Sequence, residues 1–230
     1  MSEKCDTSWN YLYRAGGICA WLYIVIALII PFLLYVDHTA LSHMYRGADI
    51  IALINGQGFL WWTVLQTTVL GTSFFAIITF SALYFALSKV HKGFAFIGAI
   101  TAIVVHILFI AYYPVLLGLG SIAQHYLYAT SSDQAELLAA AAGLIAINNA
   151  FNPLYESVFA VSIFFLSLAM LRGVFRKFEA FLGIFTSAAA ILALSLWGVV
   201  GIGYLWWWIF FMIWFILLGW RLFNLGKAGQ

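Results

Sequence analysis

The run YLWWWIFFMIWFILLGWRLF, residues 204–223, decides the fold class of this protein. It is almost wholly apolar, and its one charged residue, Arg221, lies near its C-terminal end. A helix needs about twenty apolar residues to cross the hydrocarbon core of a bilayer. Tryptophan prefers the headgroup level, and basic residues prefer the cytoplasmic side. Because Trp206, Trp207 and Trp208 lie at one end of the run and Arg221 lies near the other, we predict an oriented membrane span.

The composition of the whole chain also indicates a membrane protein. Of its 230 residues, 65 % are hydrophobic and 8 % are charged, and the mean hydropathy is +1.04. A water-soluble domain could not cover its surface with so few charges. The apolar runs are continuous and do not alternate with a period of two, which argues against a transmembrane β-barrel. The net charge of +2 is too small to suggest a nucleic-acid-binding surface.

Apolar runs of spanning length recur along the chain. We therefore predict an all-α integral membrane protein with six transmembrane helices, both termini cytoplasmic, and one membrane domain over residues 1–230. The six spans are 17–36, 59–88, 94–117, 152–171, 179–200 and 204–223. The outer segments, 37–58 and 118–151, are predicted to form a helical non-cytoplasmic cap. In the second, Asp133 and Glu136 resemble a capping box before an apolar stretch too short to span, so we expect a separate outer helix ending near Ile147.

The basic residues predict the orientation of these spans. With six spans and a cytoplasmic N-terminus, nine of the ten Lys and Arg residues fall on the inner side, and Arg46 alone falls outside. Positive charge is concentrated in the cytoplasmic loops of membrane proteins. We expect a multi-pass protein of the bacterial inner membrane. Its expected partners are membrane lipids and either other membrane proteins or a second copy of this chain.

Two short tracts carry a resemblance to a known family. The first is the Tyr-Arg-Ala-Gly-Gly-Ile-Cys-Ala-Trp-Leu-Tyr tract of residues 13–23, and the second is the basic turn over residues 172–177. The chain resembles a bacterial family known only as a domain of unknown function, whose members begin with an Arg-x-x-Gly tract entering the first span. The resemblance implies a six-helix integral membrane protein. It transfers no activity, cofactor or catalytic residue.

His106 lies near the middle of the predicted third span, where an ionisable side chain is expensive. It could be a proton relay, a haem ligand or a metal ligand. It could also be a neutral histidine hydrogen-bonded to Ser, Thr, Tyr or a carbonyl of a neighbouring helix, and we favour this interpretation. No second histidine lies in the middle of a span, which argues against bis-histidine haem binding.

A second set of polar residues lies just before the predicted fourth span and in its first turn. Asn152 is a suitable helix N-cap, Pro153 suits a first turn, and Glu156 would be stabilised there by the helix dipole. The alternative is a polar cavity open to the outside. In that interpretation Asn148, Asn149, Asn152, Glu156 and His106 bind a cation or a polar headgroup.

The outer segments hold the candidate metal ligands Asp37, His38, His43 and His125. Imidazole and carboxylate groups suit zinc, copper or iron. On a continuous helix, however, His38 and His43 would point about 140° apart, so a shared metal requires a non-helical turn between them. A solvated interfacial loop is the alternative that we favour.

The sequence contains no P-loop, dinucleotide-binding, zinc-protease or hydrolase motif. Three functions therefore stay open. The first, which we prefer, is a non-enzymatic accessory or structural subunit that packs with partner membrane proteins. The second is a small transporter or lipid-binding protein with an outward-facing polar cavity. The third is a membrane metalloprotein with an outer His/Asp site and a transition metal as its cofactor.

Overall fold

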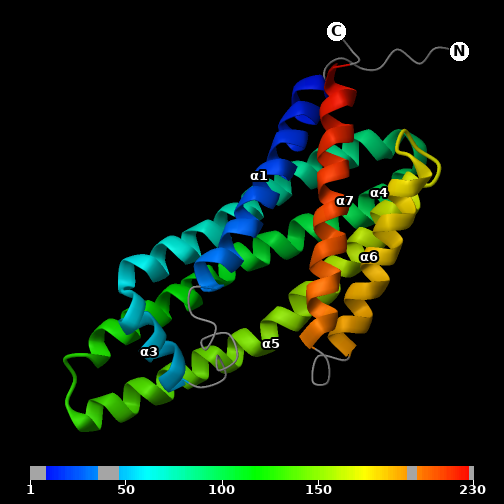
Figure 1. Cartoon of the computed structure of the whole chain (residues 1–230). Helices are drawn as coiled ribbons and strands as arrows, with labels where there is room; N and C mark the ends of the chain where they lie inside the picture. The colour runs from blue at the N-terminus through cyan, green and yellow to red at the C-terminus, as the bar shows by residue number, and fades with distance from the viewer. Residues whose placement is uncertain (1–8, 36–46, 196–200, 228–230) are drawn as a thin grey trace, which may run out of the picture. The chain divides into compact units, whose positions relative to one another are not determined.

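The computed structural model describes residues 9–35, 47–195 and 201–227. Within these ranges all regular structure is helical, and no strand is present (Figure 1). The helices are α1 (Asn10–Tyr35), α3 (Gly47–Gln57), α4 (Phe59–Tyr126), α5 (Ser131–Met170), α6 (Lys177–Ser195) and α7 (Gly201–Lys227).

Four of the described helices contain segments long and apolar enough to cross a membrane. These segments are Asn10–Ile29, Phe59–Tyr126, Ser131–Met170 and Trp207–Lys227. The all-helical class predicted from the sequence is therefore confirmed, and the four apolar helices indicate a membrane-embedded protein.

Helix α4 is a helical hairpin, because the chain turns back on itself at His91. That residue has φ −145° and ψ 77°, outside the helical region, and each of the two arms is helical on its own side of it. The turn is held locally, since the Phe94 N–H donates to Nδ1 of His91 at 3.4 Å and the two rings stack with centroids 4.1 Å apart. The segments 59–88 and 94–117, predicted as separate spans, fall on the two arms.

Helix α5 corrects the prediction for residues 131–170. We expected an outer helix ending near Ile147 and a new helix capped by Asn152, but α5 is continuous over 40 residues, with Pro153 inside it. A proline inside a helix removes one backbone hydrogen bond, and the backbone hydrogen bonds made by the other 39 residues of α5 outweigh that loss. At 1.5 Å per residue α5 is about 60 Å long, twice the thickness of the hydrocarbon core.

The start of α5 lies one turn before the expected capping box. The Asp133 N–H donates to Oγ1 of Thr130 at 3.4 Å, and the Thr130 hydroxyl donates to Oδ2 of Asp133 at 2.7 Å. Thr130 and Asp133 therefore form the reciprocal cap, in place of the predicted Asp133 and Glu136.

The chain divides into two compact units, whose limits fall inside helices. Unit 1 comprises residues 1–25, 73–107 and 155–230, and unit 2 comprises residues 26–72 and 108–154. The core of unit 2 joins α3 to both arms of α4 and to α5. Its fully buried members are Ile50, Ile51, Ile54, Trp62, Leu65, Leu119, Ala123, Ala141 and Ile145.

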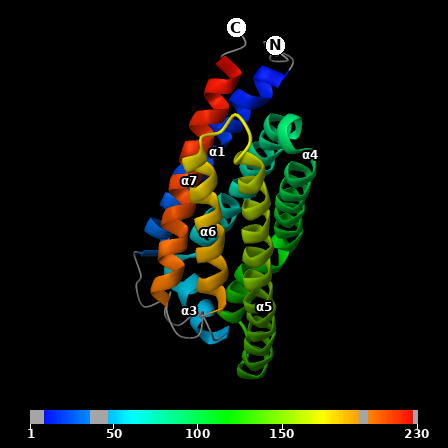
Figure 2. The same cartoon turned by 90° about the vertical axis from the view of Figure 1, so that its right-hand side faces the viewer.

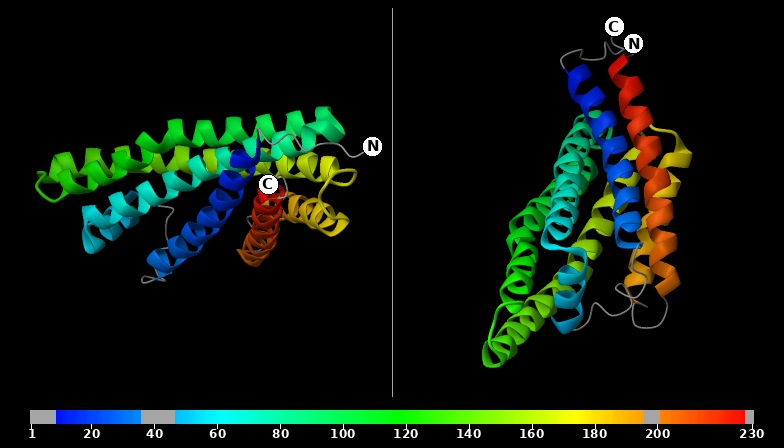
Figure 3. Two further views of the ribbon diagram at one scale, coloured as in Figure 1. Left: turned by 90° about the horizontal axis from the view of Figure 1, so that it is seen from above. Right: turned by 60° about the vertical axis from the view of Figure 1, so that its left-hand side comes forward.

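In unit 1, glycines allow α1 to approach its neighbours closely. A Cβ on Gly17 would lie 2.6 Å from the carbonyl oxygen of Gly219 in α7, and a Cβ on Gly16 would overlap Ala82 in α4. The Thr79 hydroxyl donates to the Gly16 carbonyl at 3.0 Å. Figure 2 and the right-hand view of Figure 3 show α1 and α7 side by side. Small residues at helix contacts are the usual solution for packing in lipid, where the hydrophobic effect does not draw helices together.

Candidate functional site

The core of unit 1 contains a buried histidine with both ring nitrogens engaged. His106, in the second arm of α4, is 0 % exposed. Its Nδ1 lies 2.7 Å from the Ala102 carbonyl oxygen, and its Nε2 lies 3.1 Å from the Tyr155 hydroxyl of α5. Because a carbonyl oxygen can only accept, Nδ1 carries the proton, and Tyr155 donates to Nε2. His106 thus has the hydrogen bonds of a neutral buried histidine.

Aromatic rings surround this imidazole. The ring centroids of Phe80, Phe159 and Tyr155 lie 5.8, 5.1 and 5.7 Å from that of His106. Both nitrogens are occupied and the surroundings are apolar, so this geometry favours a neutral, hydrogen-bonded histidine over a metal or haem ligand.

Glu156 places a carboxylate in the same unit. It follows Tyr155 in α5 and is 8 % exposed. Tyr23 of α1 is also buried in this unit. The Tyr23 ring packs in turn on Phe211 and Phe215 of α7, with centroids 5.7 and 5.0 Å away. Helices α1, α4 and α5 therefore each contribute a buried ionisable side chain to unit 1.

The three asparagines of the predicted cavity belong to unit 2. Asn148 Oδ1 accepts hydrogen bonds from the Tyr112 hydroxyl and from Nδ2 of Asn152, both at 3.4 Å. Asn149 is exposed. Of the five residues predicted to form one cavity, His106 and Glu156 belong to unit 1 and the asparagines belong to unit 2, and the single cavity stays a prediction.

Of the candidate metal ligands, Asp37, His38 and His43 lie outside the described residues. His125 is exposed, and its Nδ1 lies 2.8 Å from the Ser121 carbonyl oxygen of the same helix. Among the described residues, no three His, Cys, Asp or Glu side chains come together in a group that could hold a metal ion.

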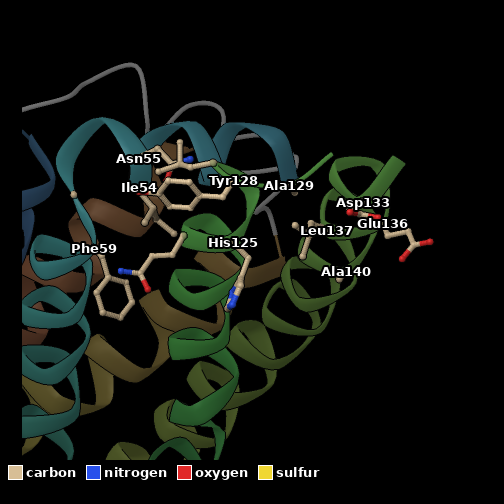
Figure 4. Close-up of a pocket in the computed structure, with 13 residues that line it drawn as sticks. Ile54, Asn55, Phe59, His125, Tyr128, Ala129, Asp133, Glu136, Leu137 and Ala140 are labelled. Carbon is tan, nitrogen blue, oxygen red and sulfur yellow. The ribbon is translucent and has the colours of Figure 1, made fainter. Parts of the chain in front are cut away.

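Unit 2 has an open groove that the sequence analysis did not anticipate (Figure 4). Its volume is about 1050 Å³, and the ends of α3, α4 and α5 line it. Its lining includes the polar or aromatic side chains of Phe59, Gln124, His125, Tyr128, Asp133 and Glu136. The lining residues come from two separate stretches of chain, 54–59 and 124–140. The one local signal is the succession of aromatic, polar and acidic residues over 125–136.

Comparisons with known proteins do not assign a function to these residues. No family model matches the chain, and neither a curated protein nor a solved structure is similar to it. The resemblance noted for residues 13–23 stays a prediction.

Proposed function

We propose that the protein is a multi-pass protein of the bacterial inner membrane, with six spans and both termini cytoplasmic. Support comes from the charges at helix ends. The described Lys and Arg residues all belong to unit 1, and they are Arg14, Lys89, Lys92, Arg172, Arg176, Lys177, Arg221 and Lys227. The described part of unit 2 has none and holds Asp49, Asp133 and Glu136. Such asymmetry is typical of an oriented membrane protein.

The contacts of unit 1 bring these basic helix ends together. Arg14 Nε donates to the Gly226 carbonyl at 3.0 Å, which ties the start of α1 to the end of α7. Arg221 Nε donates to the Val174 carbonyl at 3.0 Å, which ties α7 to the turn between α5 and α6. In the six-span topology, six crossings separate the start of α1 from the end of α7, and two crossings separate the turn between α5 and α6 from the end of α7. Both numbers are even, so each pair would lie on one side of the bilayer, in agreement with these contacts.

The topology predicts the sidedness of two exposed positions. In a protein without native thiols (Cys5→Ser, Cys19→Ala), Ser132→Cys should react with a membrane-impermeant maleimide in intact cells. Lys92→Cys should react only after the membrane is permeabilised. Labelling of Lys92→Cys in intact cells would overturn the proposed orientation.

We further propose that the protein is a small proton-linked transporter in which Glu156 binds the proton. The observation that carries this proposal is the burial of Glu156 in the apolar core of unit 1. A carboxylate inside a membrane protein is stable when it is protonated or lies beside a cation, and such residues mark proton and ion pathways. His106 and Tyr155 are further groups able to exchange protons.

A proton suits this site better than a metal ion. A hard cation needs several oxygen ligands, usually six to eight for calcium. Among the described residues, no cluster of three His, Cys, Asp or Glu side chains exists at Glu156 or elsewhere. This burial is why we place a transporter ahead of the accessory subunit that we preferred from the sequence.

Glu156→Gln tests the transporter proposal. In vesicles with an internal pH dye and an imposed membrane potential, the wild-type protein should raise proton flux, and Glu156→Gln should reduce the flux to that of protein-free vesicles. Glu156→Asp should retain part of it, because the acid is kept. Glu136→Gln is the matched control: it removes an exposed acid, and its flux should equal that of the wild type.

Infrared spectroscopy gives a second measurement that needs no transported substrate. A pH titration of the wild-type protein should show a carboxylic-acid carbonyl band that is missing in Glu156→Gln and present in Glu136→Gln. If Glu156→Gln leaves both flux and spectrum unchanged, the transporter proposal is wrong. An accessory subunit that only packs with partner proteins would then be the better interpretation.

A further inference from the structure

Two basic turns of unit 1 lie against each other. One is the α4 turn at His91, and the other joins α5 to α6 over residues 171–176. A Cβ on Gly173 would lie 3.4 Å from Cδ2 of Leu87 and 3.7 Å from Cγ2 of Val90, so the second turn packs directly on the first. Figures 1 and 2 show the two turns next to each other.

The second turn is held in place by hydrogen bonds from three sides. The Gly173 N–H donates to the Met170 carbonyl at 3.1 Å, and the Arg176 N–H donates to Oε2 of Glu179 at 2.8 Å. Arg221 of α7 donates to the Val174 carbonyl. The backbone that carries the basic side chains is therefore fixed before any ligand arrives, which reduces the entropy cost of binding.

Together the turns form a basic turn surface, defined by Lys89, Lys92, Arg172, Arg176 and Lys177. All five side chains are exposed. The described acids of unit 1 are Glu156 and Glu179, both buried, and Glu179 already binds the Arg176 N–H. The surface therefore concentrates positive charge with no exposed acid in the described part of unit 1, and it is complementary to an anion.

Exposed apolar side chains adjoin these charges. Phe178 is 65 % exposed and follows Lys177, while Phe96 is 53 % exposed and lies one helical turn after Lys92. Val174, in the turn itself, is also exposed. A free phosphate ion uses only the charges, whereas a phospholipid uses the charges with its headgroup and the apolar side chains with its acyl chains.

We propose that the basic turn surface binds the headgroup of an anionic phospholipid, with Lys92 and Arg172 on its phosphate and Phe96 and Phe178 along its acyl chains. This site is separate from Glu156 and does not depend on the transporter proposal. Clusters of Lys and Arg at the ends of spans are the usual means by which membrane proteins recognise acidic lipids.

The test compares lipids on the purified full chain in a neutral detergent. Native mass spectrometry should detect bound phosphatidylglycerol and much less phosphatidylcholine with the same acyl chains. The double variant Lys92→Gln/Arg172→Gln should bind phosphatidylglycerol about 30-fold more weakly. The control Lys227→Gln removes an exposed positive charge that is not among the five that define the surface, and it should bind as the wild type does. Added salt should weaken the binding of phosphatidylglycerol.

Three results would overturn the proposal. The first is equal binding of the two lipids. The second is an equal loss of binding in the control variant, which would indicate attraction by the total charge and no defined site. The third is displacement of phosphatidylglycerol by millimolar inorganic phosphate with the same dependence on Lys92 and Arg172, which would identify a phosphate site.

Discussion

Replacing Gly17 with valine is expected to lower the free energy of unfolding by about 3 kcal/mol. At this position α1 contacts the backbone of α7. A Cβ would lie 2.6 Å from the Gly219 carbonyl oxygen and 2.9 Å from the Phe223 nitrogen. Backbone atoms cannot move aside as a flexible side chain can, so α1 and α7 would have to separate. In lipid, packing and hydrogen bonds hold helices together, and a lost contact is not replaced by hydrophobic burial.

The measurement is unfolding of the purified protein in mixed micelles as denaturing detergent is added, followed by circular dichroism. Gly143→Val is the matched control, because a Cβ on Gly143 would meet no atom within 4 Å. Its stability should stay within about 0.5 kcal/mol of the wild type. If Gly17→Val and Gly143→Val unfold at the same denaturant concentration, the close contact of α1 with α7 is not required for stability.

Trp62→Ala is expected to have a comparable effect in unit 2, a loss of about 3 kcal/mol. Trp62 is 3 % exposed at the centre of the unit 2 core. Its indole N–H donates to the Leu116 carbonyl at 3.0 Å, and its ring packs so closely on Gly120 that a Cβ there would lie 2.7 Å from Cδ1. Alanine would leave a cavity and remove the hydrogen bond from the indole.

Amide hydrogen exchange shows which helices lose stability in Trp62→Ala. Amides of α3, which packs on the same core, should exchange faster in Trp62→Ala, while those of α6 and α7 should change little. Trp61→Ala is the control, because Trp61 is only partly buried at the edge of that core. Equal exchange of α3 in the two variants would show that burial of Trp62 does not hold unit 2 together.

Most helices could be predicted from the sequence because apolar runs of spanning length are a strong local signal. The turn at His91 was also predictable, since the basic residues Lys89 and Lys92 separate two such runs. The continuity of α5 was not. Asn152 and Pro153 have the local chemistry of a helix start, but the side chain of Asn152 bonds Asn148 within the helix, and α5 continues through Pro153.

The candidate site was only half predictable for a similar reason. His106 and Glu156 are conspicuous in the sequence because each is an ionisable residue within an apolar run. The partner of His106 is not, since Tyr155 reaches it from a different helix. Sequence spacing carries no signal for such contacts. The groove of unit 2 was missed because two stretches far apart in the chain, 54–59 and 124–140, line it together.

The hydrogen bond from Arg14 to Gly226 joins two residues that the ribosome makes at different times. The two residues are 212 positions apart. A ribosome that adds about 5 to 20 residues per second makes the second one roughly 10 to 40 s after the first. During that interval the glycine face of α1 lies in the bilayer without α7, so the translocon, a chaperone or surrounding lipid must cover it. The contact between α1 and α7 in unit 1 can therefore close only after α7 has been made.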